Sequence, residues 1–132
     1  MAESRSAGGI AEGDIRPMRF VKIGADDGLL AEADAGEKTI GISFKDTHRS
    51  DYVDDDGFHA VAGEPVKYYT VGARCFLVIS GTVAAGDRLK SDNDGAGTPV
   101  TSDGNIWGAI AERDGIAGEF IPVTVFMGQA AA

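Results

Sequence analysis

The sequence predicts a mainly β protein, a small single-domain β-barrel or sandwich with tight glycine turns and at most one short helix. Three observations favour this fold class. Glycine occurs 19 times in 132 residues and is spread along the chain, which is typical of many tight turns. Short β-branched and aromatic runs alternate with turn signals. One local pattern, Ala-Gly followed by an acid, occurs four times.

The first half of the chain offers three strands and one ambiguous segment. Residues 18–23 alternate as a strand does and end in a turn rich in Gly and Asp. Residues 29–35 fit either a helical turn or a strand. Residues 39–44 and 66–71 are strand candidates because β-branched and aromatic residues dominate them.

The second half offers four more strands. Cys75–Ile79 is a short apolar run, which predicts a strand buried on both faces and makes Cys75 a small buried hydrophobe. A short strand at residues 87–91 is followed by a hairpin turn, Asp92-Asn93-Asp94-Gly95. The last two strands are expected at residues 105–111 and 120–127. Pro122 lacks a backbone N–H, so the start of the last strand is expected at a sheet edge.

These elements divide the chain into three parts. Residues 1–14 are rich in Ala, Gly, Ser and Glu without a periodic apolar face, and we expect a flexible arm there. Residues 15–128 form the β-barrel-like domain, and residues 129–132 a short tail. Within the domain, residues 45–60 are acidic and are expected to form an exposed loop.

The repeated turn stands at Ala35-Gly36-Glu37, Ala62-Gly63-Glu64, Ala85-Gly86-Asp87 and Ala117-Gly118-Glu119. We expect its glycine to take a positive φ, which a residue with a Cβ resists. The acid would then begin the next strand, facing solvent. Glycine also occurs inside two expected strands, at Gly41 and Gly108, where it indicates a bulge, a bend or a close backbone approach.

Charge and hydropathy exclude several classes of function. The formal net charge is −9, which argues against binding nucleic acid, because that affinity depends on many Lys and Arg contacts. No apolar run approaches the ~20 residues of a membrane helix, and the first residues lack the apolar region of a signal peptide. We therefore expect neither a nucleic-acid nor a membrane partner, and synthesis in the cytoplasm.

Only one group of residues has the chemistry of metal ligands. Its members lie in the acidic loop and are His48, Asp51, Asp54, Asp55, Asp56 and His59. They could bind a divalent metal or form a solvated acidic loop, and their spacing matches no calcium or zinc pattern. We therefore predict no metal site and no cofactor. No nucleophile elbow is present and Cys75 lies in an apolar run, so no catalytic residues and no enzyme are predicted.

Several motifs follow one another in a definite order. They are Ala-Gly-Glu at 35–37, Ile-Gly-Ile-Ser at 40–43, Ala-Gly-Glu-Pro-Val at 62–66, Val-Ala-Ala-Gly-Asp-Arg-Leu-Lys-Ser-Asp at 83–92, Ile-Trp-Gly-Ala-Ile-Ala-Glu at 106–112 and Ala-Gly-Glu-Phe-Ile-Pro-Val at 117–123. This ordered series resembles the capsid decoration proteins of tailed bacteriophages, also called cement or head-stabilising proteins. The resemblance covers about residues 30–128. The acidic loop is longer than the resemblance would lead us to expect.

The resemblance implies a structural virion protein that binds the outer surface of an assembled capsid and bridges neighbouring major capsid protein subunits. Such proteins often form trimers on the shell, so a homotrimer is implied. On this hypothesis, a strand of Arg19, Phe20, Val21, Lys22 and Ile23 would contact the capsid by adding to a sheet edge. Phe76 and Trp107 are the candidates for an oligomer interface, where aromatic residues are enriched.

Two other functions stay open on the sequence. The domain could be a β-barrel module that binds a small ligand or a carbohydrate, which would need an open barrel mouth with convergent polar groups. It could also be a hydrolase that uses the loop from His48 to His59.

Overall fold

The structure is a computed structural model that describes residues 6–25, 28–35, 37–44, 60, 62–100 and 106–129. These residues form strands, turns and loops, with no helix among them, and the predicted mainly β class is confirmed. The strands are β1 (Ser6–Ala11), β2 (Phe20–Ile23), β3 (Leu29–Glu32), β4 (Gly41–Ser43), β5 (Pro65–Tyr69), β6 (Arg74–Val78), β7 (Arg88–Ser91), β8 (Gly97–Pro99), β9 (Ile106–Ala111) and β10 (Phe120–Gln129).

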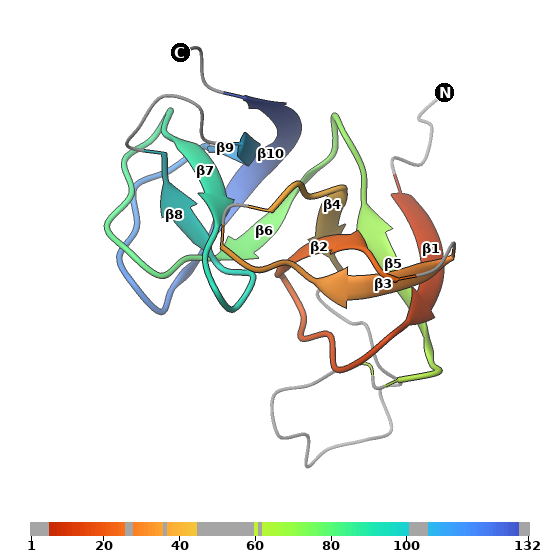
Figure 1. Ribbon diagram of the computed structural model, residues 1–132. Helices are drawn as coiled ribbons and strands as arrows, with labels where there is room; N and C mark the ends of the chain where they lie inside the picture. Colours follow the sequence, from red (N-terminus) through yellow and green to blue (C-terminus); the bar gives the residue numbers. More distant parts are fainter. Residues whose placement is uncertain are drawn as a thin grey trace.

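The strands form two sheets that lie side by side (Figure 1). The first is a closed barrel in the order β1-β3-β2-β4-β5, in which β1 and β3 are parallel and the other pairs antiparallel. The second has the order β6-β10-β9-β7-β8, and its pairs are all antiparallel. A single parallel bridge between Ile79 and Gly97 links the two ends of this second sheet.

Each sheet has its own apolar core. Three residues from the part of the chain that forms the first sheet, Phe20, Ala33 and Ile42, also belong to the second core. The barrel encloses Ala11, Ile15, Val21, Leu30, Ala60 and Val66. The second core contains Cys75, Leu77, Ile79, Val83, Leu89, Ala109, Ala111, Ile121, Val123 and Val125, together with Phe20, Ala33 and Ile42. Because successive residues of a strand point to opposite faces, Val21 fills the barrel while Phe20 leaves it and packs into the second core.

Four strands of each sheet share two strand pairings and several backbone contacts in a permuted order, although β9 pairs directly with β10 whereas β3 lies between β1 and β2. The first unit consists of β1, β2, β4 and β5, and the second unit of β9, β10, β6 and β7. Ile10 faces Pro65 across β1 and β5 as Ile110 faces Arg88 across β9 and β7. The pairing of β2 with β4 matches that of β10 with β6: Phe20 faces Ile42, and Phe120 faces Val78.

The backbone hydrogen bonds at the strand ends repeat in the same way. The Ala11 N–H donates to the Glu64 carbonyl, and the Ala111 N–H donates to the Asp87 carbonyl, both at 2.8 Å. The reciprocal bridge between Ile15 and Ala60 recurs as the bridge between Gly115 and Val83. The Met18 and Gly118 N–H groups donate to the Ser43 and Ile79 carbonyls, respectively. In chain order, the first unit runs β1-β2-β4-β5 and the second runs β6-β7-β9-β10, so the second is a circular permutation of the first.

The Ala-Gly-acid turns have the expected glycine geometry. The φ angles of Gly63, Gly86 and Gly118 are 90°, 91° and 92°, while Gly36 lies outside the described residues. The acid has a different role from the one expected. Asp87 and Glu119 each bind back to the first residue of their own turn, because their carboxylates accept from the N–H groups of Ala84 and Ile116 at 2.9 and 3.0 Å. Glu37 accepts from Asp34 N–H in the same way at 2.7 Å. The acid therefore closes the turn.

The structure contradicts the predicted extent of the arm and the predicted place of Pro122, and it decides between the two alternatives left open for residues 29–35. The flexible arm expected over residues 1–14 does not include Ser6–Ala11, which form β1 and pair with both β3 and β5. Leu29–Glu32 is strand β3 and not a helical turn. Pro122 lies in β10 between β6 and β9 and not at an edge. The missing N–H is tolerated because Pro122 lies opposite Glu112, the first residue after the end of β9, where its carbonyl accepts from the Glu112 N–H at 3.0 Å.

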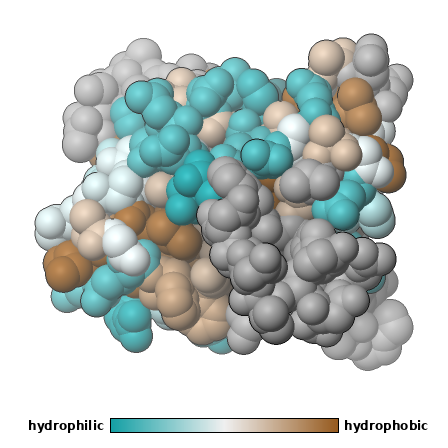
Figure 2. Space-filling view, turned by 90° about the horizontal axis from the view of Figure 1, so that it is seen from below, coloured by the Kyte–Doolittle hydropathy of each residue, from teal (hydrophilic) through white to brown (hydrophobic). Residues whose placement is uncertain are grey.

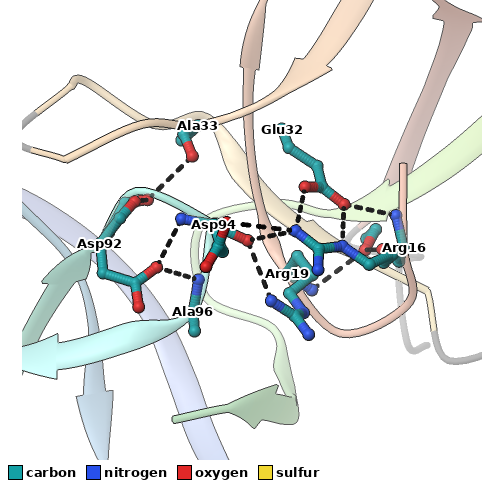
Figure 3. A network of polar contacts seen from close by, with 9 residues as sticks. Arg16, Arg19, Glu32, Ala33, Asp92, Asp94 and Ala96 are labelled. Carbon is teal, nitrogen blue, oxygen red and sulfur yellow. Dashed lines mark hydrogen bonds and ion pairs between the residues drawn. The ribbon is translucent and has the colours of Figure 1, made fainter. Parts of the chain in front are cut away.

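A polar network joins the two sheets (Figure 3). The hairpin turn between β7 and β8 is closed by Asp92, whose carboxylate accepts from the Asp94 and Ala96 N–H groups, and Gly95 has a φ of 78°. The carbonyl of Asp94 accepts from Arg16 and Arg19 of the first sheet at 3.2 and 3.0 Å. The network thus fixes the predicted hairpin turn against the barrel.

The two arginines of the network are held in different ways. Arg16 forms a two-pronged pair with Glu32, at 3.0 Å from Nε and 2.8 Å from Nη2, and this hydrogen bonding raises the pKa of Arg16. Burial and the neighbouring Arg16 charge lower the pKa of Arg19. The Phe20 N–H donates to the Gly95 carbonyl at 2.8 Å, so backbone and side chains both join the turn to the barrel.

The repeated unit provides a matched pair of substitutions. Phe20→Ala should lower the free energy of unfolding by about 3–5 kcal/mol, because it leaves a cavity in the shared core. Phe120→Ala, at the equivalent and exposed position, should lower it by less than about 1 kcal/mol. Urea unfolding followed by circular dichroism measures both values. Equal losses for the two variants would contradict the assignment of Phe20 as the residue that joins the sheets.

Candidate interaction surface

The outer face of β6 and β10 carries exposed aromatic side chains. Both strands alternate: Cys75, Leu77, Ile121 and Val123 point into the core, so their neighbours point outward. Phe76 and Phe120 are 42% and 51% exposed and form an edge-to-face pair with ring centroids 5.6 Å apart. We call the area around this pair the aromatic face.

Further apolar side chains belong to the same region of the chain. Ile116, in the turn that leads to Phe120, is 60% exposed. Pro122 faces Phe76 across the two strands. Viewed from below, apolar residues, coloured brown and tan, gather on the side of the second sheet (Figure 2). A cluster of exposed aromatic side chains on one sheet face is typical of a protein–protein contact surface.

A polar cluster borders the aromatic face along the same strands. Arg74 faces Thr124 in the register of β6 and β10, and both bind the carboxylate of Glu112. The Arg74 guanidinium uses two nitrogens, with the shorter contact at 2.6 Å. Hydrogen bonds from Arg74, and then from Thr124, lower the pKa of Glu112. The charge of Glu112 is therefore matched by that of Arg74.

The segment predicted to contact a capsid lies largely inside the molecule. Phe20 and Val21 are fully buried, and the Arg19 side chain bonds to the Asp94 carbonyl. Lys22 pairs with Glu37 at 2.8 Å. Ile23 alone of the segment is a largely exposed apolar residue, at 54%. Because β2 pairs with β3 on one side and β4 on the other, it has no open edge for strand addition in this structure.

The two residues predicted for an oligomer interface occupy different environments. Phe76 lies on the aromatic face, where it is accessible. Trp107 is only 7% exposed and lies between Phe126, at 5.4 Å between ring centroids, and the guanidinium of Arg88, at 5.1 Å from its ring. Of the two predicted residues, only Phe76 has an exposed ring.

The part of the chain that the structure describes contains no group of three metal-binding side chains. The candidate cluster from His48 to His59 lies outside the described residues. The described residues also contain no helix long and apolar enough to span a membrane. Cys75 is buried, as predicted, and burial raises the pKa of its thiol to about 12.

Sequence reasoning missed the polar network and the aromatic face as units. Phe76 and Phe120 lie far apart in the sequence and meet only because β6 and β10 are neighbours in the sheet. The alternation of apolar residues along residues 120–125 could have indicated part of this face, because it places Phe120 on the opposite side of the strand from Ile121 and Val123. Nothing local to Arg16 or Arg19 indicates that Asp94 is their partner.

Comparison with known proteins identifies a shared fold. The structure is similar to that of the N base of the head fiber gp8.5 of bacteriophage phi29. The TM-score is 0.63 at 14% sequence identity, and the match covers 96% of this chain and 96% of that chain. No family model and no curated protein matches the sequence. The similarity therefore extends over nearly the whole two-sheet architecture.

Cys75 provides a test of the second core. With its thiol buried beside the apolar interior and its pKa raised to about 12, the native protein should not react with a thiol reagent at about pH 8. In concentrated guanidinium, one thiol per chain should react. Absorbance of the chromophore released by the reagent measures the rate of reaction in the native and in the unfolded protein. Rapid reaction of the folded protein would contradict the packing of β6 against β10.

The ion pair of Arg74 and Glu112, which borders the aromatic face, can be tested by the pH dependence of stability. Since the pKa of Glu112 is lowered from its ordinary value of 4.5, its contribution to stability is present above that value and is lost as the pH falls through the pKa of the folded state. Glu112→Gln and Arg74→Gln should each make the unfolding free energy fall less steeply between about pH 5 and pH 3. Urea unfolding at each pH measures this. A wild-type slope in both variants would contradict the pairing.

Proposed function

We propose that the chain is a structural protein of a bacteriophage virion that binds the outer surface of the assembled capsid and has no catalytic activity. The observation that carries the proposal is the similarity over 96% of the chain to the base of a phage head fiber. The ordered motifs that resemble phage decoration proteins support the same setting independently, because they belong to the sequence and do not depend on the fold comparison. The interior of the barrel is filled by apolar side chains, which disfavours a ligand-binding barrel.

In this role the protein bridges neighbouring major capsid protein subunits and stabilises the shell. A protein that binds the assembled lattice better than loose subunits lowers the free energy of the assembly by mass action. Several copies, arranged as a homotrimer, gain further from multivalency. The net charge of −9 is complementary to a basic patch on the shell and speeds encounter with it.

Cosedimentation with purified phage heads tests the proposal. The protein should pellet with expanded heads built from the major capsid protein, and its affinity should fall as salt rises from about 0.05 to 0.5 M, because the attraction is between opposite charges. Bound heads should withstand higher temperature before they release DNA. Heads without the expanded lattice are the control. If the protein stays in the supernatant at low and at moderate salt, capsid binding is refuted.

A further inference from the structure

The two units of the fold expose equivalent faces to different degrees. Phe120 occupies the position in the second unit that Phe20 occupies in the first, and Val78 that of Ile42. Phe20 and Ile42 are fully buried, whereas Phe120 is 51% exposed and Val78 is partly exposed. The same face of the same unit is therefore covered in one case and open in the other.

In the first unit, the cover is another unit of this chain. Phe20 packs against β9 so closely that a Cβ at Gly108 would lie 2.8 Å from its Cε1 atom. The backbone of Phe20 also bonds to the turn at Gly95, and Ile42 belongs to the second core. The repeated unit thus uses this face to pack against a β-sheet of its own kind.

We propose that the aromatic face of β6 and β10, with Phe76 and Phe120 at its centre, binds a second copy of this chain. This surface is where neighbouring copies on the shell would touch, so the proposal rests on the proposed function. The internal packing of the first unit is the reason to choose a second copy as the occupant. A basic capsid surface is a poorer match for this face, because its bordering acid, Glu112, is already paired with Arg74.

Charge sets the conditions under which the copies associate. Two copies that each carry a net charge of −9 repel one another, but the described part of the aromatic face is apolar and its border is charge-paired. Salt screens the repulsion over a Debye length of roughly 4 Å at about 0.5 M, while the apolar contact is unaffected or strengthened. Association between copies therefore rises with salt, whereas binding to an oppositely charged shell falls.

Sedimentation equilibrium of the full chain tests the proposal. At about 0.5 M NaCl and concentrations up to about 1 mM, the wild type should associate, and association should weaken at low salt. Phe76→Ala combined with Phe120→Ala should weaken it by about 30-fold or more, as expected for two central aromatic contacts. Ile23→Ala, which removes a similarly exposed apolar side chain from the barrel, is the matched control and should change the association less than about 2-fold.

A wild type that stays monomeric throughout this range, or a double variant that associates as the wild type does, would overturn the proposal. Should the double variant fail to fold, backbone amide shifts of the wild type decide instead: dilution should move signals of β6 and β10, and movement confined to other strands refutes the assignment. The cosedimentation assay separates the two proposals. A double variant that binds heads but no longer associates supports both proposals. A wild type that associates but does not bind heads contradicts only the proposed capsid binding.

Discussion

The insertion of Phe20 into the core of the second sheet is the contact on which the relation between the two units depends. Its neighbour Val21 points the opposite way and fills the closed barrel, so one dipeptide of β2 belongs to both cores. A Phe side chain buries a large apolar area, and at this position the area is buried between sheets that share few strand hydrogen bonds. The two sheets therefore form one packed body whose hydrophobic seam lies at Phe20.

Other features of the chain follow from that seam. Position 108 is glycine because a Cβ there would meet the ring of Phe20 and the hydroxyl of Thr39. The turn at Asp92–Gly95 reaches back to the barrel, where its carbonyl groups accept from Nη1 of Arg19 and from the backbone N–H of Phe20. Buried polar groups are costly unless they are paired. These bonds therefore fix how the turn is placed against the barrel, which apolar contacts alone would not do.

Local chemistry made much of the fold predictable, and long-range pairing did not. A positive φ could be predicted for Gly63, Gly86 and Gly118, because a glycine at this place in a tight turn adopts it without steric cost. The pattern around Ile121 and Val123 likewise determined which face of β10 is buried. The burial of Phe20 could not be read in this way, because Phe20 and Phe120 precede similar apolar residues and differ only in what packs on them. The partner of each is set by topology.

The circular permutation sharpens that contrast. In the first unit, β1 and β2 precede β4 and β5, whereas in the second, the equivalent strands come last. A sequence comparison that assumes one order would align only part of the repeat, while the hydrogen bonds of Ala11, Ile15 and Met18 find their counterparts at Ala111, Gly115 and Gly118. The unit is thus defined by its bonds and not by its chain order. Packing of the two units buries the face of Phe20 and leaves the equivalent face of Phe120 exposed, because only the first unit inserts this ring into the core of the other.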